Sequence, residues 1–140
     1  MAENDLMDAA KRGDHATAEA VLDAGAVDIN TVKSGMTALM QAAMLGHEAV
    51  LKLLVDRRAS LDHQVLHGGT ALMYAANEGQ TAAAEFLIMA GADTALAWYG
   101  KTARDYALEN KHTAIVAMID NAPRLQAQAA AAAVEGRDGF

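Results

Sequence analysis

Apolar residues recur along this chain at the spacing of helix faces, in short stretches separated by glycine and polar residues. The clearest example has two such faces, made first by Leu39, Ala42 and Ala43 and then by Val50, Leu53 and Leu54. Members of each set are three or four positions apart, so they would share one side of a helix. Gly46 separates the two sets and suits the left-handed backbone that ends a helix. The pattern predicts two short helices joined by a turn.

This two-helix pattern returns with a period of about 33 residues. The segments that carry it are GMTALMQAAMLG at 35–46, GGTALMYAANEG at 68–79 and GKTARDYALENK at 100–111. An earlier copy is indicated by Ala9 and Ala10, which lie 33 positions before Ala42 and Ala43. We therefore predict four copies within 4–122. Their approximate bounds are 4–34, 35–67, 68–99 and 100–122.

The small residues in each copy indicate how the copies pack. Paired alanines would let the first helices of neighbouring copies approach closely. A single two-helix unit cannot bury its apolar face, so stacked copies supply the core and terminal copies are atypical. Polar connectors such as 28–34 are long enough for a protruding hairpin turn. The predicted fold is an all-α repeat solenoid of about four helix-turn-helix units with β-hairpin turns.

These motifs resemble the ankyrin repeat family, whose pattern runs G-x-T-P-L-H-x-A-A-x-x-G-H, then an apolar helix, then G-A-D. The best matches are GMTALMQAAMLGH at 35–47 and GGTALMYAANEGQ at 68–80, with AGAD at 90–93. The resemblance covers residues 4–122, about 85% of the chain. It implies an ankyrin-type stack that binds other proteins on a concave face.

The sequence departs from the family pattern in three ways. Alanine replaces the family proline at Ala38, Ala71 and Ala103. Met40 and Met73 replace its histidine, so we expect the histidine's hydrogen bond to the turn to be missing. Arg57-Arg58 stands where copy two should have a cap glycine, and this predicts a strained cap.

Composition narrows the function further. The 140 residues are 53% hydrophobic and carry a net charge of −7, which disfavours nucleic acid as a partner and favours a protein with a basic patch. No apolar run approaches the roughly 20 residues of a membrane span. The polar N-terminus shows no signal sequence, so we expect a cytoplasmic protein. We also expect a monomer. Cysteine is absent, and together with the alanine content this suggests a bacterial source.

No arrangement of residues indicates catalysis, so we predict neither enzyme activity nor a cofactor. His47 and His112 occupy turn positions that are structural in the family. His63 and His67 share one connector, but an extended H-x-x-x-H does not place two imidazoles on one side, and no metal site is predicted. Asp105 and Glu109 are interpreted as a solvated helix face.

The resemblance places the hairpin tips and the outward side of each first helix on the concave surface. The tip positions are Thr31, Lys33, Met36, Leu66, His67, Gly69, Trp98, Tyr99 and Lys101. The helix positions are Lys11, Arg12, Met44, Leu45, Asn77, Glu78, Glu109 and Asn110. From these we predict a partner-binding set. It consists of Lys33, Met36, Met44, Leu66, His67, Asn77, Glu78, Trp98, Tyr99, Lys101 and Glu109.

Two features of this surface have alternative interpretations. Trp98 and Tyr99 are the only adjacent aromatic residues, and they either anchor a partner or seal the end of the stack. Met36, Met40 and Met44 are spaced by four residues, and they either contact a partner adaptably or fill the core.

The tail, residues 123–140, is rich in alanine and has little apolar surface beyond Leu125 and Val134. It is either a further helix that covers the last copy or an extension that becomes helical only on contact, because isolated helices of this length are marginal in water. The end of the tail, 136–140, should be disordered unless Phe140 docks.

The leading functional interpretation is a non-catalytic protein–protein interaction module that acts as an inhibitor, immunity protein or adaptor. Two alternatives remain. One is a small-ligand or enzymatic pocket beneath the hairpins, and the other is an architectural stack without a partner.

The helix pattern makes a prediction about stability. Leu72 lies on the inward face of its predicted helix, so Leu72→Ala should lower the free energy of unfolding by about 2–5 kcal/mol. Urea denaturation measures this change. A loss below about 0.5 kcal/mol, typical of surface positions, would mean that the helix phase is wrong.

Overall fold

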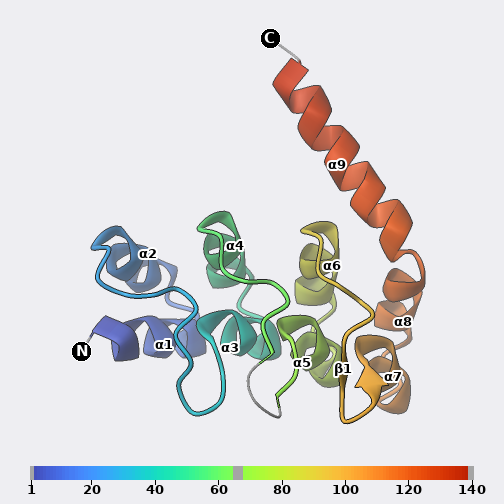
Figure 1. Ribbon diagram of the computed structural model, residues 1–140, viewed down its shortest axis with the longest axis horizontal. Coiled ribbons are helices and arrows are strands. Elements are labelled where there is room, and N and C mark those ends of the chain that lie inside the picture. The colour runs from blue at the N-terminus through green and yellow to red at the C-terminus, as the bar shows by residue number, and fades with distance from the viewer. Residues whose placement is uncertain (1, 65–67, 139–140) are drawn as a thin grey trace.

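Nine helices form among the residues that the computed structural model describes, which are 2–64 and 68–138. Eight of them make four pairs in sequence order: α1 (Ala2–Arg12) with α2 (His15–Asp23), α3 (Ala38–Leu45) with α4 (Glu48–Asp56), α5 (Ala71–Glu78) with α6 (Thr81–Met89), and α7 (Ala103–Glu109) with α8 (Thr113–Asp120). Figure 1 shows two rows, which we call the first-helix layer (α1, α3, α5, α7) and the second-helix layer (α2, α4, α6, α8). The predicted all-α repeat stack is confirmed.

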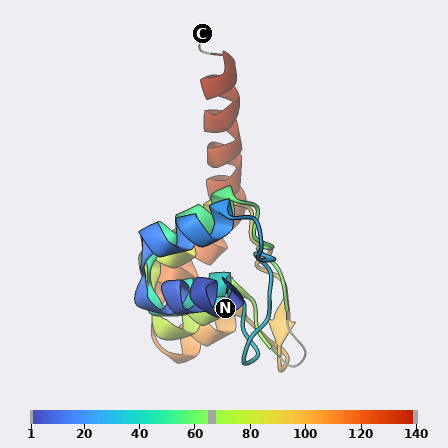
Figure 2. The ribbon, with the colours of Figure 1, turned by 90° about the vertical axis from the view of Figure 1, so that its left-hand side faces the viewer.

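The connectors between pairs leave the helices on one side of the stack, as Figure 2 shows. The last connector is a hairpin in which β1 (Ala97–Trp98) pairs antiparallel with β2 (Lys101–Thr102). Its turn residues Tyr99 and Gly100 have φ of 54° and 76°. In the first connector Ser34 and Gly35 have φ of 55° and 78°, inside an antiparallel bridge between Lys33 and Met36. Two successive positive φ values define the tight turn whose twist suits a hairpin.

Threonine caps the first helix of the last three pairs. The hydroxyl oxygens of Thr37, Thr70 and Thr102 accept hydrogen bonds from the backbone N–H three residues later, at 3.2–3.4 Å. In return, the Sδ atoms of Met40 and Met73 accept the backbone N–H of Thr37 and Thr70 at 3.4 Å. The expectation that this turn would lose its side-chain bond is therefore wrong. Sulfur is a weak acceptor, but the unbranched methionine side chain reaches the position that the family gives to histidine.

The core lies between successive first helices and between the two layers. Ala42, Ala43, Ala75 and Ala76 are 0% exposed, and their small methyl side chains allow α3 and α5 to approach each other closely. Larger side chains fill the space between the layers. They include Leu39, Met40, Leu51, Leu54, Leu72, Met73, Leu87 and Ile88. Of the three evenly spaced methionines, Met40 is thus a core residue.

Polar side chains connect each copy to the one before it. His47 Nε2 donates to the carbonyl of Lys11 at 2.9 Å, and His112 Nε2 donates to that of Asn77 at 3.2 Å, which confirms structural roles for both histidines. Gln80 Nε2 makes the same bond to Met44 at 3.0 Å. The imidazole of His47 passes so close to the preceding turn that a Cβ at Gly13 would lie 2.6 Å from it.

Two helix ends that lack glycine, those of α4 and α7, still adopt the left-handed backbone that glycine favours. Arg58 has φ of 69° after α4, and Lys111 has φ of 64° after α7. The residue equivalent to Arg58 after α2 is Gly25, with φ of 72°, and the residue equivalent to Lys111 after α5 is Gly79, with φ of 73°. A Cβ raises the energy of this left-handed conformation, so the predicted strained cap in copy two is confirmed at Arg58.

The alanine-rich tail forms helix α9 (Ala122–Asp138), which packs against α6 and α8 at its start and then extends away from the stack (Figure 1). Ala122 is buried, Leu125 is half-buried, and Gln126 Nε2 donates to the carbonyl of Ala92 at 3.1 Å. Within 2–64 and 68–138, no helix is both long and apolar enough to cross a membrane.

The strained cap can be relieved by substitution. Arg58→Gly should raise the free energy of unfolding by about 1 kcal/mol, because glycine adopts positive φ without steric cost. Gly25→Ala is the matched control, since a Cβ there would meet no atom within 4 Å, and it should lower stability by a similar amount. Urea midpoints compare the two variants. A loss of stability in Arg58→Gly would show that the arginine side chain makes a contact that outweighs the strain.

Candidate binding surface

The last hairpin and the two first helices beside it bring together an aromatic cluster, made of Tyr74, Trp98, Tyr99 and Tyr106. The ring of Trp98 lies at its centre, with ring centroids 5.6 Å from Tyr74, 5.5 Å from Tyr99 and 5.8 Å from Tyr106. Sequence reasoning found Trp98 and Tyr99 but missed the other two. The available signal was that Tyr74 and Tyr106 lie 32 positions apart, at the same place in successive first helices.

The two adjacent aromatic residues have different environments. Trp98 is half-buried and covers the backbone of Gly69, where a Cβ would lie 2.8 Å from the indole. It therefore fills the junction between the second and third connectors, rather than the open end of the stack. Tyr99 is 76% exposed at the tip of the hairpin. Large aromatic surfaces are costly to expose, and Tyr99 is the most exposed large apolar side chain in the part of the chain that the structure describes.

Polar contacts fix the hairpin on α7. The hydroxyl of Tyr106 donates to the carbonyl of Trp98 at 2.6 Å, and burial raises the pKa of that hydroxyl above its ordinary value. Lys101 Nζ donates to Glu109 Oε1 at 2.6 Å and lies 5.9 Å from the centre of the Tyr106 ring. This hydrogen bond, which the Lys101 ammonium donates to the Glu109 carboxylate, is the main reason that the pKa of Lys101 is raised. Two predicted site residues thus form an ion pair between the hairpin and the end of α7.

The predicted methionine contacts lie on and beside α3. Met36 is half-buried, and its sulfur accepts a hydrogen bond from Gln41 Nε2 at 3.3 Å. Met44 is half-buried and its neighbour Leu45 is 42% exposed, at the end of the same helix. Lys33 is exposed in the first hairpin. Lys33 and Met36 thus face each other in the first hairpin, whereas Met44 lies at the end of α3.

The remaining predicted positions lie on α5 and in the second connector. Asn77 and Glu78 are exposed at the end of α5, and Asn77 Oδ1 accepts a hydrogen bond from Asn110 Nδ2 at 2.8 Å, which links α5 to α7. Leu66 and His67 lie outside the described residues.

Two acidic side chains in and beside the connectors have structural partners. Asp105 Oδ2 accepts the backbone N–H of Thr102 at 3.0 Å, as part of the cap of α7. Asp62 Oδ1 accepts the backbone N–H of Asp93 at 2.8 Å and so connects successive turns. Among the side chains that the structure describes, no group of three or more His, Cys, Asp or Glu residues could hold a metal ion. The hairpins and first helices therefore offer an accessible surface and ordered hydrogen-bonding groups to another molecule.

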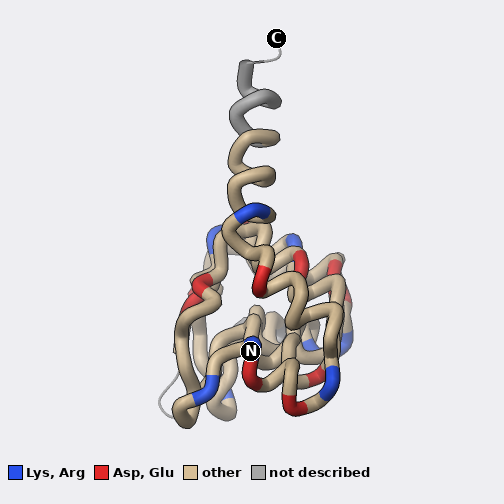
Figure 3. The backbone as a smooth tube through the Cα atoms, turned by 90° about the vertical axis from the view of Figure 1, so that its right-hand side faces the viewer, with Lys and Arg blue, Asp and Glu red and all other residues tan. Residues whose placement is uncertain are grey.

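Charges of both signs are spread over the stack, as Figure 3 shows, with 18 acidic against 11 basic residues in the whole sequence. Several of them are paired between neighbouring elements. Arg57 contacts Asp23 at 2.6 Å, and Arg104 contacts Asp120 at 2.7 Å. The second pair explains the arginine that replaces leucine in the last copy, since Arg104 reaches from α7 to the end of α8.

Comparison with known proteins agrees with the repeat assignment. A family model described as ankyrin repeats (3 copies) matches two overlapping segments, 6–97 and 59–128. No curated protein matches the chain.

The aromatic cluster yields a prediction for stability. Tyr106→Phe should lower the free energy of unfolding by about 1 kcal/mol, because it removes the hydroxyl that donates a hydrogen bond to the carbonyl of Trp98. Tyr74→Phe is the matched control, because it makes the same change in the same cluster. It should lower the free energy of unfolding by less than half as much. Urea denaturation followed by the fluorescence of Trp98, the single tryptophan, measures both. Equal costs would show that the hairpin does not depend on this bond.

Proposed function

The chain belongs to the ankyrin repeat family, and we propose that it is a non-catalytic module that binds a partner protein through its hairpin tips and first-helix layer. Ankyrin repeats are in general protein–protein interaction modules. Typical members have no enzymatic activity, and we extend this to the present chain.

The observation that carries the proposal is the exposed ring of Tyr99. Its backbone is held at φ 54° by a paired hairpin, and its ring rests against the half-buried indole of Trp98. A side chain that is already ordered loses little conformational entropy when a partner binds. Tyrosine is also among the residues that contribute most to binding energy at interfaces. Neither a buried ligand pocket nor an architectural stack needs an aromatic ring at this tip.

The rest of the proposed surface supports this anchor. Met36 and Met44 offer flexible apolar contacts that can adapt to an irregular partner. Asn77, Glu78, Lys33 and the Lys101–Glu109 pair supply polar groups around them, and we retain Leu66 and His67 as predicted members. Such a surface combines an aromatic anchor with a polar rim, which is the usual composition of an interface.

The charge of the chain suggests the chemistry of the partner. A net charge of −7 favours a protein with a basic patch, because opposite charges speed the encounter and disfavour wrong partners. We propose that the protein acts in the cytoplasm as a monomer, in the role of an inhibitor, immunity protein or adaptor.

The proposal is tested by a substitution that removes the aromatic ring of Tyr99 and keeps the backbone conformation of the hairpin turn. Tyr99→Ser suits this purpose, because Ser34 has nearly the same φ at the same place in the first hairpin. The tagged protein would capture partners from a lysate of its source, with retained proteins quantified by mass spectrometry. A partner held by the wild type should be reduced roughly 5- to 30-fold by Tyr99→Ser, equivalent to about 1–2 kcal/mol.

The matched control is Leu108→Ala, which removes another exposed apolar side chain, 53% accessible on α7. Leu108 stands where earlier copies have the buried residues Ala43 and Ala76, so it faces the end of the stack and not the hairpin tips. The Leu108→Ala protein should capture the same amount of partner as the wild type. Equal capture by Tyr99→Ser would contradict the proposed surface.

A further inference from the structure

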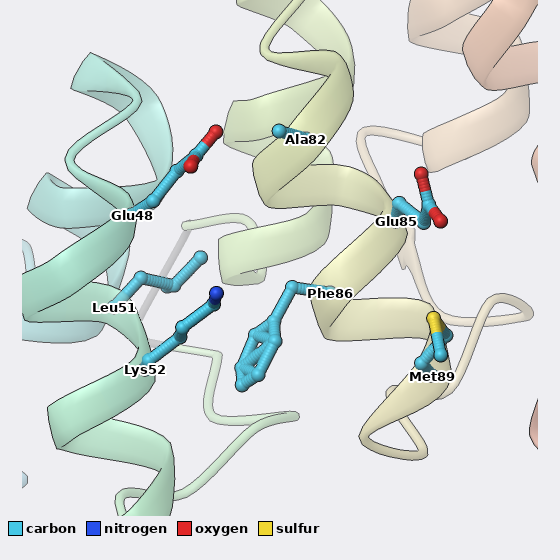
Figure 4. A pocket seen from close by; sticks show the side chains of 7 residues that line it. All are labelled: Glu48, Leu51, Lys52, Ala82, Glu85, Phe86 and Met89. Carbon is cyan, nitrogen blue, oxygen red and sulfur yellow. The ribbon is translucent and has the colours of Figure 1, made fainter. Parts of the chain in front are cut away.

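A groove of about 350 Å³ lies in the second-helix layer, between α4 and α6 (Figure 4). Glu48, Leu51 and Lys52 line it from α4. Ala82, Glu85, Phe86 and Met89 line it from α6. In both helices the lining positions are three or four residues apart, so each helix contributes one continuous stripe. We call this space the second-layer groove.

The groove is open because the two layers pack differently. The paired alanines bring α3 and α5 close together, whereas α4 and α6 contact each other much less. Ala82 leaves one end of the groove unfilled, and the ring of Phe86 projects from α6 toward Lys52 in Figure 4. Met89 is 41% exposed and Phe86 is half-buried. An apolar strip is therefore accessible to another molecule.

Acidic residues outnumber basic ones on the helices of this layer, and two of them, Asp23 and Asp120, are paired with arginines outside these helices. The four helices of the second-helix layer carry six acidic residues and one basic residue. They are Glu19, Asp23, Glu48, Asp56, Glu85, Asp120 and Lys52. The single amine, Lys52 Nζ, lies 5.9 Å from the centre of the Phe86 ring. Among the described residues, Glu48 and Glu85 form no ion pair. Two carboxylates thus flank an apolar strip without a cation of their own.

Another helix already packs on the neighbouring part of this layer. The start of α9 contacts α6 and α8, with Ala122 buried, Leu125 half-buried and Gln126 bonded to the carbonyl of Ala92. Side chains of one helix fit into the furrow between two others, which is the ordinary mode of helix packing. The second-layer groove is the corresponding furrow one copy earlier.

We propose that the second-layer groove docks an amphipathic, basic helix of a partner protein. Leucine-like side chains of that helix would cover Phe86 and Met89, and its lysine or arginine residues would pair with Glu48 and Glu85. Helix-in-groove recognition of this kind places apolar anchors at i, i+3, i+4 and i+7. The site is separate from the hairpin tips, so the protein could hold two partners at once.

The test uses a synthetic helical peptide of about 16 residues, built from leucine, alanine and lysine with leucine on one face and a fluorescein label. A second peptide carries glutamate in place of lysine. Fluorescence anisotropy measures binding to the full chain and to Ala82→Arg, whose new side chain fills the open end of the groove. We expect Ala82→Arg to weaken binding of the lysine peptide about tenfold, or 1.4 kcal/mol.

The chain offers a matched control for the added charge. Ala49 lies 33 positions before Ala82, at the same point of α4, and is likewise exposed but does not line the groove. Ala49→Arg should bind the lysine peptide as the wild type does, and urea midpoints confirm that both variants are folded. The double variant Glu48→Gln, Glu85→Gln changes charge without bulk and should also weaken binding, with less dependence on salt.

Three results would overturn this proposal. One is equal affinity of Ala82→Arg and Ala49→Arg for the lysine peptide, and another is equally tight binding of the glutamate peptide. The third is a wild-type dimer in sedimentation that Ala82→Arg dissociates, because the groove would then belong to a second copy. Tyr99→Ser should bind the lysine peptide as tightly as the wild type does. The experiment therefore tests the second-layer groove independently of the hairpin tips.

Discussion

The close approach of neighbouring first helices is the contact on which the rest of this protein depends. No two-helix unit can bury its own apolar face, so each copy relies on the next. Ala42, Ala43, Ala75 and Ala76 have no accessible surface, and they allow this approach because their side chains are single methyl groups. With aromatic residues at 4% of the chain, the core is built from leucine, methionine and alanine at close range.

This spacing also organises both candidate surfaces. Close packing in the first-helix layer brings successive hairpins into contact, so that Trp98 can cover Gly69 of the preceding connector and support the exposed ring of Tyr99. The second-helix layer is packed less tightly, and the furrow between α4 and α6 is the consequence. One geometric requirement therefore orders the aromatic tip on one part of the molecule and opens an apolar groove on another.

The departures from the family pattern show which features the fold requires. Methionine can replace histidine at the first-helix cap, because its sulfur still reaches the backbone N–H of Thr37 and Thr70. Arginine and lysine can replace glycine at two helix ends, but only by adopting positive φ at Arg58 and Lys111. The backbone conformation of each turn is thus the same in different copies even where the residue type differs. The stacking of the copies imposes this conformation on each turn.

The sequence by itself determined the period, the paired helices, the buried leucines and the structural roles of His47 and His112. The paired helices and their buried leucines follow from spacings within one copy. The period follows from comparing the copies, and the histidine roles follow from the resemblance to the ankyrin pattern. Only the tertiary structure decided that Trp98 fills a junction while Tyr99 is exposed, that Tyr74 and Tyr106 join them, and that a groove opens between α4 and α6. Those outcomes depend on side chains from different copies, such as Gln80 and Met44, which are 36 positions apart in the chain but in hydrogen-bond contact in space. Their relative positions are set by how closely the copies stack, and a pattern within one copy carries no measure of that distance.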